Sequence, residues 1–170
     1  TDGKVACWGL NMDGVLSYSG AQDGAFVPPT IVPLDGPVDE LAIARRTIVE
    51  PPQLCTGCPP TIIDHFAVIA RHASGEVSSW GLVPLVGRAT ELKPDPTPGR
   101  VTIEHATRVF GGYGACALSG TALGCWGYGR DDVTGYVRPL PIPLVPDATH
   151  VALGDYGESS FGRGCAVRPD

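Results

Sequence analysis

Short apolar runs separated by turns rich in glycine and proline recur along the whole chain. No window carries a sustained apolar face at i, i+3, i+4 and i+7, and prolines interrupt most stretches, so the pattern predicts little helix. Three of the runs end in the same tryptophan–glycine phrase: Ala6-Cys7-Trp8-Gly9, Ser78-Ser79-Trp80-Gly81 and Gly124-Cys125-Trp126-Gly127. A recurring phrase indicates one structural unit copied three times, and runs this short are typical of strands. The pattern therefore predicts an all-β repeat protein.

The last of these phrases closes a hairpin that can be paired residue by residue. Directly opposed residues in an antiparallel hairpin share a constant sum of residue numbers. Leu118 with Leu123 and Cys116 with Cys125 have the same sum, across the turn 119–122. Opposed Cβ atoms lie about 4.5–5.5 Å apart, which is close enough for a disulfide. The hairpin near 115–126 is therefore expected to carry a bridge between Cys116 and Cys125.

The hairpin near 66–80 can be laid out in the same way. The pairing places Ala67 opposite Ser79 and Ile69 opposite Val77, joined by a loop over 70–76. Both cysteines are then replaced together, by Ala67 and Ser79, as expected if they act as a pair.

The two ends of the chain supply the third hairpin in two pieces. Residues 164–170 hold its first strand and residues 3–8 hold its second. Set end to end, Cys165 lies opposite Cys7, with the register of the other hairpins, so a disulfide between Cys7 and Cys165 is expected. We expect the termini to be severed halves of one hairpin, joined either within one chain or between chains.

A further strand precedes each hairpin, and a proline-rich apolar stretch precedes that strand. The strands are Val38–Ala44, Ala106–Gly112 and Ala148–Gly154, and the stretches are Ile31–Leu34, Val101–Ile103 and Pro143–Pro146. Each unit then has about four strands, and proline suits the outer edge of a sheet.

Size and charge limit the class of protein. A chain of 170 residues forms one core, so residues 1–170 are expected to be a single repeat domain. The net charge of −6 argues against nucleic acid and anionic membranes as partners, and no apolar run is long enough for a membrane span. The chain begins at Thr1 without a methionine, which we interpret as a processed or excised product. Six cysteines favour disulfides and an oxidising compartment.

The repeat resembles the regulator-of-chromosome-condensation (RCC1-like) repeat. The phrases that carry the likeness are Leu41–Ala44, Val151–Gly154, Cys116–Leu118 and Cys125–Gly127. The resemblance implies a β-propeller of four-stranded blades whose terminal strands meet in one blade. The cysteine-bearing form looks like the variant found in secreted bacterial proteins. The Gly-Gln-Leu-Gly stretch of the family is weak here, with Asp13–Leu16 as its nearest relic. Three blades are fewer than a closed propeller has, so we expect a partial propeller or part of an assembled one.

Insertions of unequal length follow the strands that precede the hairpins. The longest, Arg45–His65, contains Cys55 and Cys58 in a Cys-x-x-Cys spacing, and a second insertion spans Asp155–Gly164. Prolines around the cysteine pair deny the helix that a thioredoxin-like redox site needs, and a metal site lacks a fourth ligand beyond His65. A local disulfide is favoured, with redox and metal readings left open.

The sequence favours a non-enzymatic module for protein–protein interaction or scaffolding, without a cofactor or metal. No nucleophile elbow, phosphate loop or zinc motif is present. The expected partner is a protein or further copies of the chain bound through the terminal strands, in a secreted, periplasmic or cell-surface setting. Insertions on one face of a repeat often bind partners. The candidate partner-binding residues are Leu54, Thr56, Tyr156, Glu158 and Phe161.

A lectin-like propeller that binds carbohydrate or another small ligand is the alternative. It predicts exposed aromatic side chains on one face, for which the candidates are Tyr113, Tyr128, Tyr136, Tyr156 and Phe161. The tryptophans are expected to pack between blades instead. Of the histidines, His72 is placed in a solvated hairpin loop, and His150 shares a strand position with Arg108 and Glu40 on a polar blade surface.

Overall fold

The computed structural model describes residues 2–16, 20–50, 59, 61–83, 85–92, 94–127, 140–142, 148–154 and 163–167. These residues form twelve strands and no helix, as the short apolar runs predicted. The strands are β1 (Ala6–Leu10), β2 (Phe26–Ile31), β3 (Val38–Glu50), β4 (Thr61–His72), β5 (Val77–Gly81), β6 (Asp95–Arg100), β7 (Ala106–Gly112), β8 (Gly114–Ser119), β9 (Ala122–Trp126), β10 (Leu140–Ile142), β11 (His150–Gly154) and β12 (Arg163–Val167).

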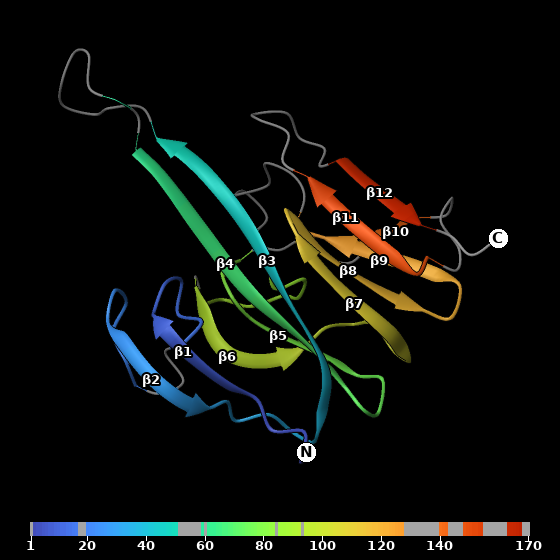
Figure 1. Cartoon of the computed structure of the whole chain (residues 1–170), viewed down its shortest axis with the longest axis horizontal. Coiled ribbons are helices and arrows are strands. Elements are labelled where there is room, and N and C mark those ends of the chain that lie inside the picture. Colours follow the sequence, from blue (N-terminus) through green and yellow to red (C-terminus); the bar gives the residue numbers. More distant parts are fainter. Residues whose placement is uncertain are drawn as a thin grey trace.

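The strands form two complete four-stranded sheets and two two-stranded ones (Figure 1). The first blade has the order β3-β4-β5-β6, and the second has β7-β8-β9-β10. The pair β1-β2 forms an N-terminal half-blade, and β11-β12 forms a C-terminal half-blade. Strand β3 packs against β7, and β7 packs against β11, so these three are the inner strands of consecutive blades. All pairings between strands are antiparallel.

The register of the second blade is as predicted, and that of the first blade is shifted. Cys116 lies opposite Cys125, and their sulfur atoms are bridged. In the first blade, however, Ile69 lies opposite Ser79, not Val77. The prediction was wrong because β4 continues three residues further toward the turn, to His72, while β5 begins at Val77 as expected. The shorter turn closes tightly, with the backbone N–H of His72 donating to Glu76 O at 2.8 Å. The counterpart of the cysteine pair is therefore Ile69 and Ser79.

The proline-bearing strands belong to a different blade from the one expected. They are β2, β6 and β10, and each pairs with the tryptophan-bearing strand that precedes it in the sequence. The stretch Val101–Ile103, predicted as an outer strand, is instead a buried connection between blades. A blade thus begins at its inner strand and ends at its proline-bearing strand. Proline is tolerated there because an edge strand loses little when an N–H is removed.

The tryptophans of the complete blades pack between blades, as predicted. Trp80 and Trp126 are fully buried. The indole N–H of Trp80 donates to Val15 O at 2.9 Å, and that of Trp126 donates to Leu85 O at 2.7 Å. Each acceptor lies in the loop that follows the tryptophan-bearing strand of the preceding blade, so each indole ties its own blade to that neighbour.

The expected hairpin between the termini is not formed within one chain. Among the described residues, β12 pairs with β11 and β1 pairs with β2, in separate sheets (Figure 1). Two complete blades lie between the half-blades along the series, which keeps Val167 and Val5 apart. The blades themselves do not depend on that pairing, because each complete sheet closes with its own four strands.

Candidate interaction surface

Equivalent positions on the inner strands are linked from blade to blade. The carboxylate of Glu40 on β3 accepts from Arg108 Nε at 2.7 Å and from the backbone N–H of Val109 at 3.0 Å, both on β7. Arg108 in turn donates to Thr149 O, next to β11, at 3.4 Å. His150 holds the same position on β11 and is exposed. The shared position predicted from the sequence is therefore a line of polar contacts that runs from one blade to the next.

The inner strand of the first blade leaves one face uncovered. Leu41 and Ile43 on β3 are 49% and 60% exposed. Their counterparts on β7 are Val109, which is buried against the first blade, and Gly111, whose added Cβ would lie 2.2 Å from Ile43 O. On β7 these positions meet the preceding blade at close range. On β3, the same positions face the side on which the inner strands of a preceding blade would lie.

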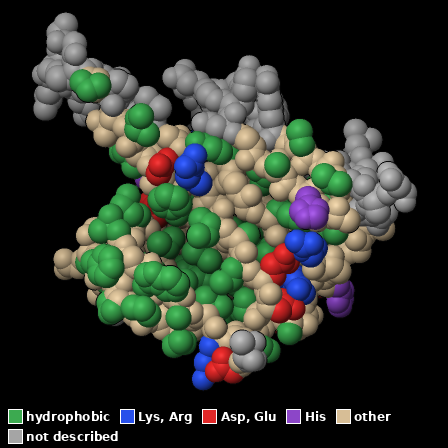
Figure 2. Space-filling view, in the orientation of Figure 1, with side chains coloured by type: hydrophobic (Ala, Val, Ile, Leu, Met, Phe, Trp, Pro, Cys, Tyr) green, Lys and Arg blue, Asp and Glu red, His purple; other side chains and the backbone are tan. Residues whose placement is uncertain are grey.

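The N-terminal half-blade covers only part of that side. Val5 and Val32 pack on Ala70 and Trp80 of the first blade. The opposite face of the half-blade is open, and Trp8 is 66% exposed although its two counterparts are fully buried. We call the exposed apolar side chains of this region the N-terminal apolar surface: Trp8, Leu10, Phe26, Ile31, Leu41 and Ile43. Figure 2 shows hydrophobic side chains gathered over β1 and β2 and continuing toward the middle of the molecule.

The C-terminal half-blade is open on its other side. Val151 and Leu153 of β11 pack against the cluster around Phe110 in the second blade. The remaining side chains alternate outward, and Cys165 and Val167 on β12 are exposed. We call the unpaired side of β12 the C-terminal edge.

The two half-blades are the inner and outer halves of one blade type. The pairing of Ala152 with Cys165 repeats that of Phe110 with Cys116, so β11-β12 matches the inner pair β7-β8. The pairing of Cys7 with Thr30 repeats that of Cys125 with Leu140, so β1-β2 matches the outer pair β9-β10. The C-terminal half-blade therefore lacks an outer pair of strands, which the N-terminal half-blade has, and the N-terminal half-blade lacks the inner pair.

The described part of the insertion Arg45–His65 forms an arm. Strands β3 and β4 run on through it, and this hairpin projects beyond the blade (Figure 1). Asp13 fixes its base, accepting from the backbone N–H of Phe66 at 2.7 Å and sharing a 2.6 Å hydrogen bond with His65 Nδ1. The remaining predicted positions in both insertions lie outside the described residues: Leu54, Cys55, Thr56, Cys58, Tyr156, Glu158 and Phe161.

Tyr113, an aromatic candidate of the lectin-like alternative, is held at the base of this arm. Its hydroxyl accepts from Arg45 Nη2 at 2.9 Å and lies 2.8 Å from Thr47 Oγ1, and the Arg45 guanidinium lies over its ring at 4.8 Å. One face of the ring is thus covered by a cation. The other aromatic candidates, Tyr128, Tyr136, Tyr156 and Phe161, lie outside the described residues.

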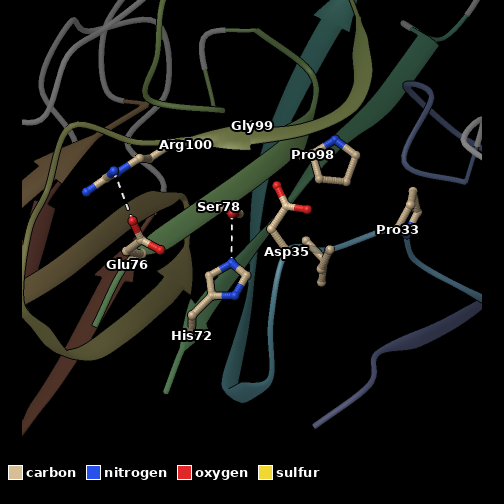
Figure 3. Close-up of a pocket in the computed structure, with 9 residues that line it drawn as sticks. Pro33, Asp35, His72, Glu76, Ser78, Pro98, Gly99 and Arg100 are labelled. Atoms are coloured by element: carbon tan, nitrogen blue, oxygen red, sulfur yellow. Dashed lines mark hydrogen bonds and ion pairs between the residues drawn. The ribbon is translucent and has the colours of Figure 1, made fainter. Parts of the chain in front are cut away.

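A small cavity of about 260 Å³ lies between the N-terminal half-blade and the first blade (Figure 3). His72 lines it and is 3% exposed, so the expectation of a solvated loop histidine was wrong; it ends β4, and the tight turn buries it. Its Nε2 lies 2.8 Å from Ser78 Oγ, the spacing of a base and a nucleophile. Its buried Nδ1 has no hydrogen-bond partner among the described residues, so none of their carboxylates orients the ring as the third member of a triad does. Glu76 is paired with Arg100 at 2.9 Å.

The described residues hold no cluster of three or more side chains suited to a metal ion. Within the same part of the chain, no helix has the length and apolarity to cross a membrane.

No family model and no curated protein matches this sequence. Solved structures do match its fold. The structure of human WBSCR16 superposes with a TM-score of 0.54 at 20% identity, covering 84% of this chain and 34% of that one. Prp20p from Saccharomyces cerevisiae, whose binding to Gsp1p and histones is described with its structure, gives a TM-score of 0.42 at 14% identity over 88% and 49% of the two chains. The chain has an RCC1-like propeller fold.

The chain spans about a third of WBSCR16 and about half of Prp20p. The Cys116–Cys125 bridge, with a Cα–Cα distance of 4.0 Å, joins the inner and outer halves of the second blade. In a complete blade, the inner and outer halves meet where β8 pairs with β9. Among the described strands, the equivalent edges of the half-blades, on β12 and β1, have no such partner.

Proposed function

We propose that this chain is a non-enzymatic interaction and scaffold module that binds a protein partner, or further copies of itself, through its terminal strands. The observation that carries the proposal is the pair of half-blades. Among the described residues, each has a strand edge that no other strand pairs with, beside exposed apolar side chains. Contiguous apolar surface of this kind marks protein interaction sites in soluble proteins. An added strand would satisfy the open backbone groups and cover the apolar surface at once.

The open edge of β1 presents backbone groups in a defined direction. Val5 O, just before β1, accepts from the backbone N–H of Val32, just after β2, at 2.9 Å. The C=O and N–H of one peptide group point in opposite directions, so the N–H of Ala6 points away from β2, toward the open edge. On β12, Val167 O accepts from the N–H of Thr149. The same alternation directs the N–H of Ala166 to the C-terminal edge.

The buried bridge between Cys116 and Cys125 supports an oxidising compartment, and we place the module in a secreted or periplasmic setting on that ground. Leu54 and Thr56 on the insertion Arg45–His65, and Tyr156, Glu158 and Phe161 on the second insertion, are proposed as further contacts with a partner.

A peptide with the β12 sequence tests whether the N-terminal half-blade accepts a strand. The peptide Phe161–Asp170, with serine in place of cysteine, is titrated into the Ala166→Pro chain, whose own C-terminal edge is blocked. We expect shifts in the backbone amide resonances of Ala6 and Trp8, because the added strand would lie along β1.

The control peptide carries the Ala166→Pro change and lacks the N–H that faces β1. The proposal holds if the first peptide shifts the β1 amides at concentrations where the control does not. Equal shifts with both peptides, or none with either, would show that the open edge does not take a strand.

A further inference from the structure

We infer that the partner is a second copy of this chain, joined head to tail at both ends in a closed six-bladed ring with twofold symmetry. The inference rests on the proposed function and names its partner. The C-terminal half-blade of each copy would supply the inner half of the blade whose outer half is β1-β2 of the other copy. Two complete blades and one composite blade per copy give six blades from two copies, within the usual four to eight.

The register of the composite blade follows from the second blade. There Cys116 and Cys125 are opposed with Cα atoms 4.0 Å apart, which marks a pair that is not hydrogen-bonded, so the flanking pair Ala117–Gly124 exchanges backbone bonds. Their counterparts in the composite blade are Ala166 and Ala6. The N–H groups of both point to the open edges, so the two edges match in register and in bond direction.

The composite blade would also cover the exposed apolar positions of the first blade. In the second blade and the C-terminal half-blade, the inner strand packs its residues at the positions of Leu41 and Ile43 on the preceding blade. In the ring, β11 and β12 of the second copy would occupy that place. Val167, which is 59% exposed in the single chain, lies at the position of Leu118, a residue buried in the interface between the second blade and the C-terminal half-blade.

The exposure of Trp8, on the other face of the half-blade, supports the same arrangement. Trp80 and Trp126 each bury their indole on the preceding blade. The blade that precedes the composite one in the ring is the second blade of the second copy. Trp8 would therefore become buried there, as its two counterparts are.

The polar positions of the inner strands would also meet around the ring. Glu40 contacts Arg108 on the next blade, and Arg108 reaches the strand of His150. The inner strand that follows His150 in the ring is β3 of the second copy, which carries Glu40. A histidine thus meets a carboxylate at the junction between copies, and no like charges are opposed.

Two measurements on the 170-residue chain test the inference. Light scattering after size exclusion is expected to give twice the chain mass of 17.7 kDa, and the mass should fall on dilution. Acrylamide quenching should show Trp8 protected in the dimer and accessible in the monomer, with the Trp8→Phe chain as the reference that reports the two buried tryptophans alone.

Edge variants test the strand pairing itself. Ala166→Pro and Ala6→Pro each remove an N–H that faces the seam, and each is expected to weaken the dimer roughly 100-fold, because both seams of a homodimer lose bonds. Mixing the two variants restores one intact seam, between β12 of the Ala6→Pro chain and β1 of the Ala166→Pro chain. A heterodimer should therefore form where neither variant pairs alone. Ala166→Ser and Ala6→Ser keep the N–H and should remain dimeric.

The outcomes separate the second copy from other partners. A chain that stays monomeric at all concentrations, yet binds the β12 peptide, would refute the inference that the partner is a second copy. The proposed function as an interaction module would still hold. Masses that grow without limit would overturn the closed ring, since a rotation that does not close gives filaments. A dimer that both proline variants leave intact would show that the seam lies elsewhere.

Discussion

The three tryptophans form an internal comparison for the energetics of the blades. Trp126→Phe removes an indole N–H from a fully buried site and leaves Leu85 O without its donor at 2.7 Å. A buried acceptor that loses its partner costs about 1–3 kcal/mol. The smaller ring also leaves a cavity in the interface between blades, which adds roughly 1 kcal/mol. We expect Trp126→Phe to lower the free energy of unfolding by about 2–4 kcal/mol.

Trp80→Phe should cost a similar amount, because its N–H donates to Val15 O at 2.9 Å from an equally buried site. Trp8→Phe should change the free energy of unfolding by less than about 0.5 kcal/mol in the monomer, since surface substitutions are nearly neutral. The three single variants are compared in the Ala166→Pro background, so that assembly does not contribute.

Urea unfolding followed by circular dichroism measures the three values, because fluorescence changes with the substitutions themselves. The midpoint and the slope are fitted together, so that a change in the unfolded state is separated from a change in stability. If Trp126→Phe and Trp8→Phe have the same free energy of unfolding within error, the argument that indoles hold consecutive blades together is refuted.

Two further substitutions probe contacts within and between blades. Gly111→Ala places a Cβ 2.2 Å from Ile43 O, a backbone atom that cannot move aside, and should cost about 1–3 kcal/mol in thermal or urea unfolding. Gly164→Ala meets the flexible Leu153 side chain at 3.3 Å and serves as the control, and equal losses would contradict the close approach of the blades. Replacing Cys116 with Ile and Cys125 with Ser copies the pair found in the first blade. It should keep the fold and lose about 2–3 kcal/mol, as expected for a bridge over nine residues; an unchanged urea midpoint would show that the bridge contributes nothing.

The local order of the chain could be predicted from the sequence because strands and turns depend on neighbouring residues. Apolar runs broken by glycine and proline predicted an all-β repeat, and the opposed cysteines predicted the register of β8 and β9. The first blade shows the limit of this reasoning. Without cysteines to fix the pairing, the loop was drawn three residues too long on the β4 side, which shifted the register. His72 was therefore placed in solvent, although the tight turn buries it.

Which strand belongs to which blade was decided by the tertiary structure. Proline stretches precede each inner strand in the sequence, yet β2, β6 and β10 pair backward, with the tryptophan-bearing strands before them. Pairing between strands depends on edges that become neighbours only after folding, and sequence order does not reveal them.

The sequence by itself determined that the ends are two halves of one blade type, because Cys165 and Cys7 repeat the pattern of a complete hairpin. In the tertiary structure β1 pairs with β2 and β12 pairs with β11, so the two described halves do not pair with each other. The same tryptophan that is buried at positions 80 and 126 is exposed at position 8, since burial depends on the presence of a preceding blade. That distinction is a property of the folded surface, and no local pattern carries it.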